Sequence, residues 1–221
     1  ISALDACLGD LLQTLDKTGL AENTIFVYTS DHGDMLWSHG EWRKQWPFDE
    51  SIRVPFLLRY PGFFGRSGKV VDALINTPDI MPTLLGLCGL PISQTVEGLD
   101  YSPILRGEAC NDVEAALIAC YQPFSEFQPA WGGRAYRGIR TRRYTYARDL
   151  NGPWLLFDNE TDPYQQHNLC GDPAHAELLV TLDVQLQRLL AKRGDEFLPG
   201  EVLMQRRGYP MDESGAVPFR E

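Results

Sequence analysis

The spacing of apolar residues along the first hundred positions predicts alternating helices and strands. Apolar residues recur every three or four positions at Ile1, Leu4, Leu8, Leu11 and Leu15. This spacing predicts an amphipathic helix over residues 1–17 that ends near Gly19. Two apolar runs rich in β-branched and aromatic residues, 24–30 and 53–60, predict strands.

A second helix is predicted over residues 77–88, with Thr77 as its N-cap and Pro78 at its first position. Helices and strands that alternate in this way are typical of the layers of an α/β sheet. The following segment, 95–133, is rich in Gly, Pro and polar residues, and we interpret it as a crossing linker.

From Ala135 the pattern changes to short strands, with hairpin turns at Asn151-Gly152-Pro153 and Asn159-Glu160. A final helix is predicted from N-cap Asp172 to Gly194, with Leu179, Leu182, Leu186 and Leu189 facing inward. Residues 195–221 show little periodicity and are interpreted as a tail. The chain then divides into an α/β part with its linker, residues 1–133, and a small C-terminal α+β subdomain with its tail, residues 134–221.

Candidate chemistry follows the strand 24–30, which ends on Asp31, His32 and Gly33. Side chains just past the carboxyl end of a parallel strand face the crevice where ligands bind. Gly33 permits a sharp turn, so both neighbouring side chains can face one ion. An oxygen donor beside a nitrogen donor suits a divalent cation, and calcium, magnesium, manganese and zinc are all admissible. Alternatively, Asp31 caps a following helix and His32 is an ordinary loop histidine.

A larger set of motifs surrounds this pair, and a lone lysine, Lys44, follows Asp31 by thirteen positions. The motifs are Thr29-Ser30-Asp31-His32-Gly33-Asp34, Ser38-His39-Gly40, Lys44, Glu50-Ser51-Ile52-Arg53-Val54-Pro55 and Arg59-Tyr60-Pro61-Gly62. Their order resembles the sulfatase family, within the alkaline phosphatase superfamily of hydrolases. The resemblance implies that Asp31 and His32 bind a divalent metal, with calcium favoured, and that Lys44 contacts the oxygens of the sulfate or phosphate group.

The same resemblance gives His39 two candidate roles, one behind the metal ligands and one as a proton donor to the leaving group. A histidine that only packs within its loop is the alternative. Over most of the chain, to about Arg193, the resemblance implies an α/β fold. This fold is the C-terminal part of an alkaline-phosphatase-like mixed sheet with flanking helices, followed by a small antiparallel sheet packed on a C-terminal helix.

One departure from the family pattern concerns the nucleophile, which in sulfatases is a cysteine or serine in a Cys/Ser-x-Pro-x-Arg context. The sequence contains no such motif around Cys7, Cys88, Cys110, Cys120 or Cys170. We therefore expect the chain to be the C-terminal portion of a larger enzyme and to be inactive alone. The function expected for the larger enzyme is metal-dependent cleavage of sulfate esters. The alternatives are a phosphonate monoester hydrolase or phosphodiesterase of the same superfamily, and a truncated piece without catalysis.

The charge and the apolar runs of the sequence indicate which kinds of partner the protein binds. With 20 basic and 30 acidic residues the net charge is −10, which disfavours nucleic acid. The one basic stretch, Arg137 to Arg148, is interpreted as the solvent face of an alternating strand rather than an anion-binding surface. No apolar run approaches the ~20 residues of a membrane helix. The expected partner is a small-molecule sulfate or phosphate-type ester. The oligomeric state stays open, as does localisation, with the cytoplasm slightly favoured over the periplasm.

Five cysteines match neither a zinc pattern nor a disulfide scaffold, so reduced thiols are expected. Cys7 and Cys88 lie on apolar helical faces and are predicted to be small core residues. A pairing between Cys110 and Cys120 depends on geometry that the sequence does not give.

Overall fold

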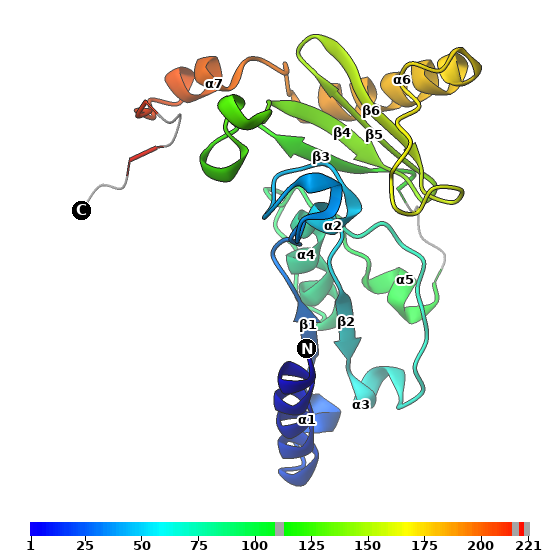
Figure 1. Ribbon diagram of the computed structural model, residues 1–221. Coiled ribbons are helices and arrows are strands. Elements are labelled where there is room, and N and C mark those ends of the chain that lie inside the picture. The colour runs from blue at the N-terminus through cyan, green and yellow to red at the C-terminus, as the bar shows by residue number, and fades with distance from the viewer. Residues whose placement is uncertain (109–112, 214–216, 219–221) are drawn as a thin grey trace.

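The computed structural model describes residues 1–108, 113–213, 217 and 218. In Figure 1 the first hundred residues form a narrow lower part, and a sheet built from later residues lies above it. The loop that follows the first strand reaches upward from the narrow part to this sheet. The candidate residues of the sequence analysis therefore lie where the two parts meet.

The narrow part is built around a pair of strands. Its elements are α1 (Ser2–Lys17), η1 (Ala21–Asn23), β1 (Phe26–Thr29), η2 (Ser38–Gly40), α2 (Asp49–Ile52), β2 (Phe56–Arg59), α3 (Pro61–Phe64), α4 (Thr77–Leu87) and α5 (Ser102–Arg106). In the described ranges, β1 pairs with β2 alone, in the register Phe26↔Arg59 to Thr29↔Phe56. The pair is antiparallel, which the expected mixed sheet allows. Only short helical turns separate them, whereas parallel neighbours are usually joined by a crossover helix.

The predicted helix 77–88 is confirmed as α4, but its N-cap is Asn76 rather than Thr77. The side-chain oxygen of Asn76 accepts from the Thr77 amide at 2.8 Å, and the Asp79 carboxylate accepts from the Asn76 amide at 2.8 Å. This reciprocal arrangement satisfies amides that the first helical turn leaves free. Asn76 keeps an extended backbone, so Thr77 already belongs to the helix.

Within the described residues, the upper part holds a four-stranded antiparallel sheet in the order β3-β4-β5-β6. Its strands are β3 (Ala116–Cys120), β4 (Tyr136–Arg140), β5 (Tyr144–Asp149) and β6 (Gly152–Asp158). The interpretation of 95–133 as a linker was therefore wrong where it covers α5, β3, η3 (Ser125–Phe127) and η4 (Pro129–Trp131). The division of the chain at residue 133 stays a prediction, although β3 before it pairs with β4 after it.

The predicted C-terminal helix is confirmed as η5 (Pro173–His175) and α6 (Ala176–Arg193). Asp172 caps the first turn, and Gly194 ends the helix in the left-handed region at φ 64°. Leu182, Leu186 and Leu190 of α6 are buried against the sheet, and Leu179 and Leu189 pack at the margin of this core. Leu190 also belongs to this core, although its place on the inward face was not predicted. The helix α7 (Gly200–Arg206) was not predicted either, so the tail is not without regular structure.

A second core lies between the sheet and the loop after β1. It joins Met35, Trp46 and Phe48 from the loop with Phe127, Tyr136 and Phe157 from the upper part. Because Met35 is fully buried, the loop is fixed on the sheet by packing as well as by hydrogen bonds.

The basic stretch is not a free solvent face, because each of its five arginines pairs with an aspartate. The pairs are Arg137–Asp195, Arg140–Asp49, Arg142–Asp72, Arg143–Asp158 and Arg148–Asp183. The interpretation as a solvent face was wrong most clearly for Arg137, which is 0% exposed. A guanidinium can lie inside a protein when a carboxylate binds two of its N–H groups, as Asp195 does here.

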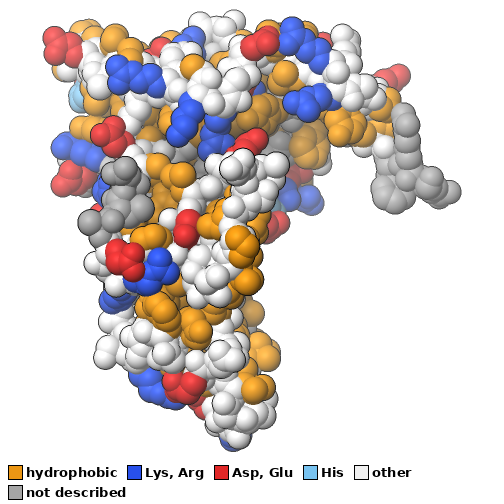
Figure 2. Space-filling view, turned by 180° about the vertical axis from the view of Figure 1, so that it is seen from behind, with side chains coloured by type: hydrophobic (Ala, Val, Ile, Leu, Met, Phe, Trp, Pro, Cys, Tyr) orange, Lys and Arg blue, Asp and Glu red, His pale blue; other side chains and the backbone are white. Residues whose placement is uncertain are grey.

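The narrow part leaves much apolar surface in contact with solvent. Among the described residues of α1 none is buried, and Figure 2 shows hydrophobic side chains at the surface of this part. Cys7 and Cys88 are exposed, so their assignment to a core was wrong. Cys120 is a buried free thiol, whereas Cys110 lies outside the described residues. None of the described helices combines the length and hydropathy that crossing a bilayer requires.

Candidate functional site

Asp31, His32 and Lys44 come together just past the end of β1. The Oδ2 atom of Asp31 lies 3.4 Å from Nε2 of His32, and Nζ of Lys44 lies 2.8 Å from that same nitrogen. Asp31 is exposed, and His32 is partly exposed. The predicted proximity of the two metal-ligand candidates is therefore present, and Lys44 joins them across the loop.

The backbone around His32 selects one form of its ring. Nδ1 lies 2.7 Å from the carbonyl oxygen of Gly33. A carbonyl oxygen only accepts, so Nδ1 carries the proton, and in the neutral ring the lone pair is on Nε2. A hydrogen bond of this kind is how proteins usually orient a histidine that binds a metal through its other nitrogen. Here Nε2 faces both Asp31 and Lys44.

The backbone of Gly33 lies very close to the backbone at Glu50 and Ser51, which fixes the position of the residues next to it. Its amide donates to the Ser51 carbonyl at 2.8 Å. A β-carbon on Gly33 would lie 1.9 Å from the carbonyl oxygen of Glu50. Gly33 is absent from the residues with positive φ, so the glycine is required by the neighbouring chain at α2 rather than by a left-handed turn.

The loop that carries Lys44 has an unusual backbone. Five of its residues adopt positive φ without being glycine, namely Leu36, Trp37, His39, Arg43 and Gln45. Such conformations cost about 1–3 kcal/mol each and persist where surrounding contacts impose them. The Gln45 side chain provides such contacts, because Nε2 donates to the Phe124 carbonyl at 3.3 Å and Oε1 accepts from Cys120 Sγ at 3.8 Å. Lys44 therefore precedes a residue whose side chain is held by β3 and by Phe124.

A buried carboxylate, Glu126, lies near the loop lysine. Burial alone would raise its pKa. Hydrogen bonds from the Ser125 hydroxyl and its own amide, together with the charges of Arg43 and Lys44, hold that pKa below the usual value. The Oε2 atom lies 3.9 Å from Nη1 of Arg43. Glu126 is therefore ionised at neutral pH and offsets part of the positive charge of the loop.

Asp31 is suited to metal binding by its charge as well as its position. Its pKa lies below the usual value, chiefly because its own backbone amide donates to the carboxylate, with contributions from His32 and Ser30. Ligands must be deprotonated before they bind a metal ion, and Asp31 meets that requirement at neutral pH.

His39 contacts Phe48 and Glu50 rather than Asp31, His32 or Lys44. Its ring stacks on Phe48 with centroids 4.0 Å apart, and Nε2 lies 3.8 Å from Oε1 of Glu50. That nitrogen is buried without a hydrogen-bond partner among the described residues. The contacts suit a packing histidine, and a role of His39 in proton transfer stays a prediction.

The donor atoms fit a divalent ion in kind and spacing. A carboxylate oxygen and an imidazole nitrogen 3.4 Å apart can both bind one ion at distances of about 2.0–2.6 Å. In the part of the chain that the structure describes, no group of three or more His, Cys, Asp or Glu residues is arranged to hold a metal. The chain thus offers a pair of ligands, and the choice among calcium, magnesium, manganese and zinc stays a prediction.

Sequence reasoning found Asp31, His32 and Lys44 but missed Gln45 and Glu126. Neither residue stands in a recognisable motif, and each acts through a contact across a long sequence distance. The Gln45 amide contacts Phe124 from a backbone with positive φ, which no local pattern reveals.

Comparisons with known proteins agree with these motifs. Residues 37–192 match the family model described as N-sulphoglucosamine sulphohydrolase, C-terminal. The chain is 42% identical to an ulvan-active sulfatase of Formosa agariphila, over 100% of this chain and 43% of the relative.

Two solved structures are similar as well. A protein in complex with its substrate D-glucosamine-2-N,6-O-disulfate shares 29% identity at a TM-score of 0.79, over 90% of this chain and 40% of that one. A phosphonate monoester hydrolase of Agrobacterium radiobacter shares 27% identity at a TM-score of 0.76, over 100% of this chain and 44% of that one. The chain thus spans less than half the length of these relatives.

Proposed function

This chain belongs to the sulfatase family of the alkaline phosphatase superfamily, and from that premise we propose that the protein carrying it hydrolyses sulfate esters with a divalent metal ion. The observation that supports the proposal most directly is the convergence of Asp31, His32 and Lys44. A carboxylate, an imidazole and a lysine side chain within a few ångströms of one another suit an anionic group bound between a metal and a lysine.

Each residue has a separate part in the proposed chemistry. Asp31 and His32 would hold the metal, and Gly33 keeps the His32 ring in the form that can bind it. When bound, the ion would neutralise the nonbridging oxygens of the transferred group. Lys44 would contact those oxygens and stabilise the charge that builds on them in the transition state. A lysine suits this task because it is a compact charge on a flexible stem.

One observation favours a second candidate, hydrolysis of phosphonate monoesters. The phosphonate monoester hydrolase of Agrobacterium radiobacter matches the whole of this chain. A tetrahedral phosphonate presents similar oxygens to a metal and a lysine. Rates of the intact protein on matched aryl sulfate and aryl phosphonate esters would separate the two candidates.

The test of the proposal combines metal content with kinetics on the intact protein. Lys44→Ala should lower kcat/KM by roughly two to four orders of magnitude, because it removes a preorganised charge donor, and should leave metal content near wild type. Asp31→Ala should lose both metal and activity. Lys44→Arg should not restore the rate, because the guanidinium is planar and wider. A matched control is Lys17→Ala on α1, where the ammonium donates to Gln13 at the surface.

Two results would contradict the proposal. If Lys44→Ala stayed within threefold of wild type, Lys44 would be a surface lysine. If Asp31→Ala retained its metal, the ligand assignment would be wrong.

A further inference from the structure

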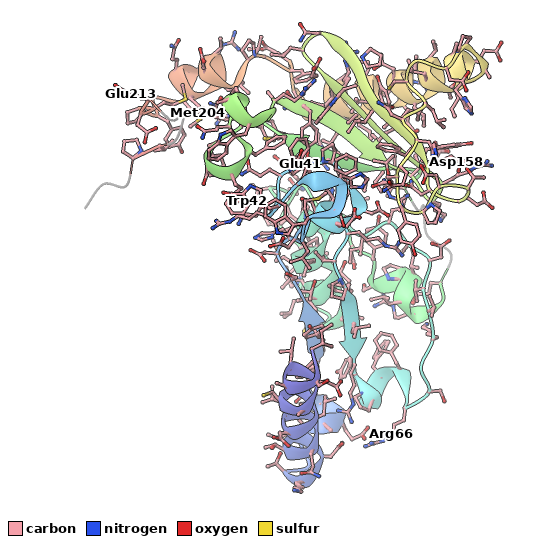
Figure 3. All side chains as sticks on the ribbon, viewed as in Figure 1. Glu41, Trp42, Arg66, Asp158, Met204 and Glu213 are labelled. Carbon is pink, nitrogen blue, oxygen red and sulfur yellow. The ribbon has the colours of Figure 1, made fainter. Side chains whose placement is uncertain are left out.

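An open cavity of about 520 Å³ lies beside Lys44, between the loop, the end of β3 and α7. Its lining includes Lys44, Gln45, Cys120, Tyr121, Phe124 and Met204. Figure 3 shows Met204 on α7, on the same side of the molecule in this view as Trp42 of the loop. The cavity therefore joins the candidate anion site to the C-terminal segment.

The loop wall of this cavity is fixed relative to the sheet. Gln45, the residue after Lys44, bonds the carbonyl of Phe124 and accepts from the thiol of Cys120, and both of these residues line the cavity. A group bound in the cavity would consequently lie at a constant offset from the backbone that carries Lys44. Preorganisation of this kind is what a substrate subsite requires.

The opposite wall is also held in place. The guanidinium of Arg137 lies 3.8 Å from the ring centre of Tyr121, and Arg137 is itself paired with Asp195. At the start of α7, a β-carbon on Gly200 would lie 2.6 Å from the Tyr121 carbonyl oxygen. This close approach seats α7 against the end of β3 and places Met204 over the cavity.

The lining is mostly apolar and aromatic, with two amide side chains, Gln45 and Gln122, and one basic side chain, Lys44. Among the described residues that line the cavity, Lys44 is the one that is charged at neutral pH. Burial raises the pKa of the Cys120 thiol to about 12, so Cys120 remains neutral. A second charged group on a ligand would lose water here without gaining a charged side chain of its own, because Lys44 already faces the transferred group. An uncharged ring would bury its apolar face and could still bond the amides of the lining.

We infer that this cavity binds the alcohol part of the ester when that part is an uncharged ring with an apolar face, while Lys44 holds the transferred group. The inference rests on the proposed function. A phenyl ring and an uncharged pyranose share this chemistry, and a uronate ring does not.

The test uses the intact protein with its metal and four esters: 4-nitrophenyl sulfate, an uncharged hexose sulfate, a uronate sulfate and methyl sulfate. Met204→Ala and Phe124→Ala should each raise KM for the two uncharged rings by roughly tenfold, as for loss of an apolar contact. The KM for methyl sulfate, which has no ring, should stay within twofold. If only the aryl ester responds, the ring is a phenyl, and if only the hexose ester responds, it is a pyranose. Either result supports the inference.

Phe124→Ala is informative because Gln45 bonds the backbone carbonyl of Phe124, so the change leaves that contact intact. The matched control is Met81→Ala, a half-exposed methionine on α4, which should change no KM. Thermal melts of each variant check that the fold is kept, and Phe124→Ala alone carries the test if Met204→Ala does not fold.

The outcomes separate this inference from the proposed function. If sulfate esters are hydrolysed but both variants keep every KM within twofold, the cavity is not a subsite and the proposed function stands. A preference of the wild type for the uronate sulfate over both uncharged rings would also overturn the inference. If the intact protein hydrolyses none of the esters with any divalent ion, the proposed function fails and this inference fails with it.

Discussion

Replacing Gly33 by alanine should damage the candidate site more than any nearby change of equal size. The new β-carbon would lie 1.9 Å from the Glu50 carbonyl oxygen, whereas real β-carbons almost never come within 3.0 Å of another atom. One of the two backbones must then move by at least 1.1 Å, the difference between these distances. Gly33 also accepts from Nδ1 of His32, so the movement is transmitted directly to the imidazole.

The expected cost has two parts. Overpacking of this kind destabilises a fold by about 1–3 kcal/mol. A misplacement of about 1 Å at a reacting centre lowers the rate by roughly 10²-fold. We therefore expect Gly33→Ala in the intact protein to lose roughly 10²-fold in kcat/KM and to bind its metal more weakly. Neither loss requires a change in any side chain that contacts the substrate.

The assay compares thermal unfolding, metal titration by calorimetry and steady-state kinetics with those of a control variant. Gly68→Ala is a suitable control, because a β-carbon there meets no atom within 4 Å and φ lies outside the left-handed region. Gly33→Ala with wild-type metal affinity and a kcat/KM within threefold of wild type would refute the reasoning. It would mean that α2 can move away from β1 without disturbing His32.

Three further predictions concern the chain itself. A hydrogen bond from Arg143 lowers the pKa of Asp158 to about 2. The ionised carboxylate therefore stabilises the fold above pH 4, and this stabilisation is lost as pH falls towards 2. Asp158→Asn should therefore lower Tm at pH 7 by roughly 2–4 °C and have a much smaller effect at pH 2, whereas an equal effect at both values would contradict this assignment. Iodoacetamide at pH 8 should label the exposed Cys7 in the folded chain and spare Cys120, whose pKa is raised by burial, and equal labelling rates would contradict that burial. The 221-residue chain alone should show no measurable turnover with added calcium, magnesium or manganese, because two donors leave most coordination positions to water; turnover that Asp31→Ala abolishes would overturn this view.

The sequence revealed elements whose signals are local and repeated. The α6 helix carries leucines at helical spacing between an Asp-Pro start and a glycine stop, so its ends could be placed within a few residues. The β5–β6 hairpin has a polar turn between two apolar runs. In both cases the information lies within the element itself, and tertiary contacts need not be known.

Other features depend on partners far along the chain, and local patterns gave no sign of them. The short strand β3 was hidden in a segment of mixed composition, and its pairing with β4 makes it a strand. The local sequence around Arg137 is typical of an exposed strand face, and only its ion pair with the distant Asp195 explains why it is buried. At the site, the order of the motifs identified Asp31, His32 and Lys44. The hydrogen bond from Gln45 to the Phe124 carbonyl was not predicted, because Gln45 has a positive φ that local patterns do not reveal.

The pairing of β4 arginines with distant aspartates limits how segments of this protein can be exchanged with those of relatives. Arg140 pairs with Asp49 at the start of α2, and Arg137 pairs with Asp195 before α7, so β4 holds two segments that are far apart in the chain. A transplanted loop without the first aspartate would leave Arg140, whose side chain is 15% exposed, without its carboxylate. A transplanted tail without the second would do the same to the fully buried Arg137. Breaking such a pair costs about 3–5 kcal/mol, which is a large share of the stability of a domain. In a working chimera, each arginine and its aspartate must therefore come from the same parent protein.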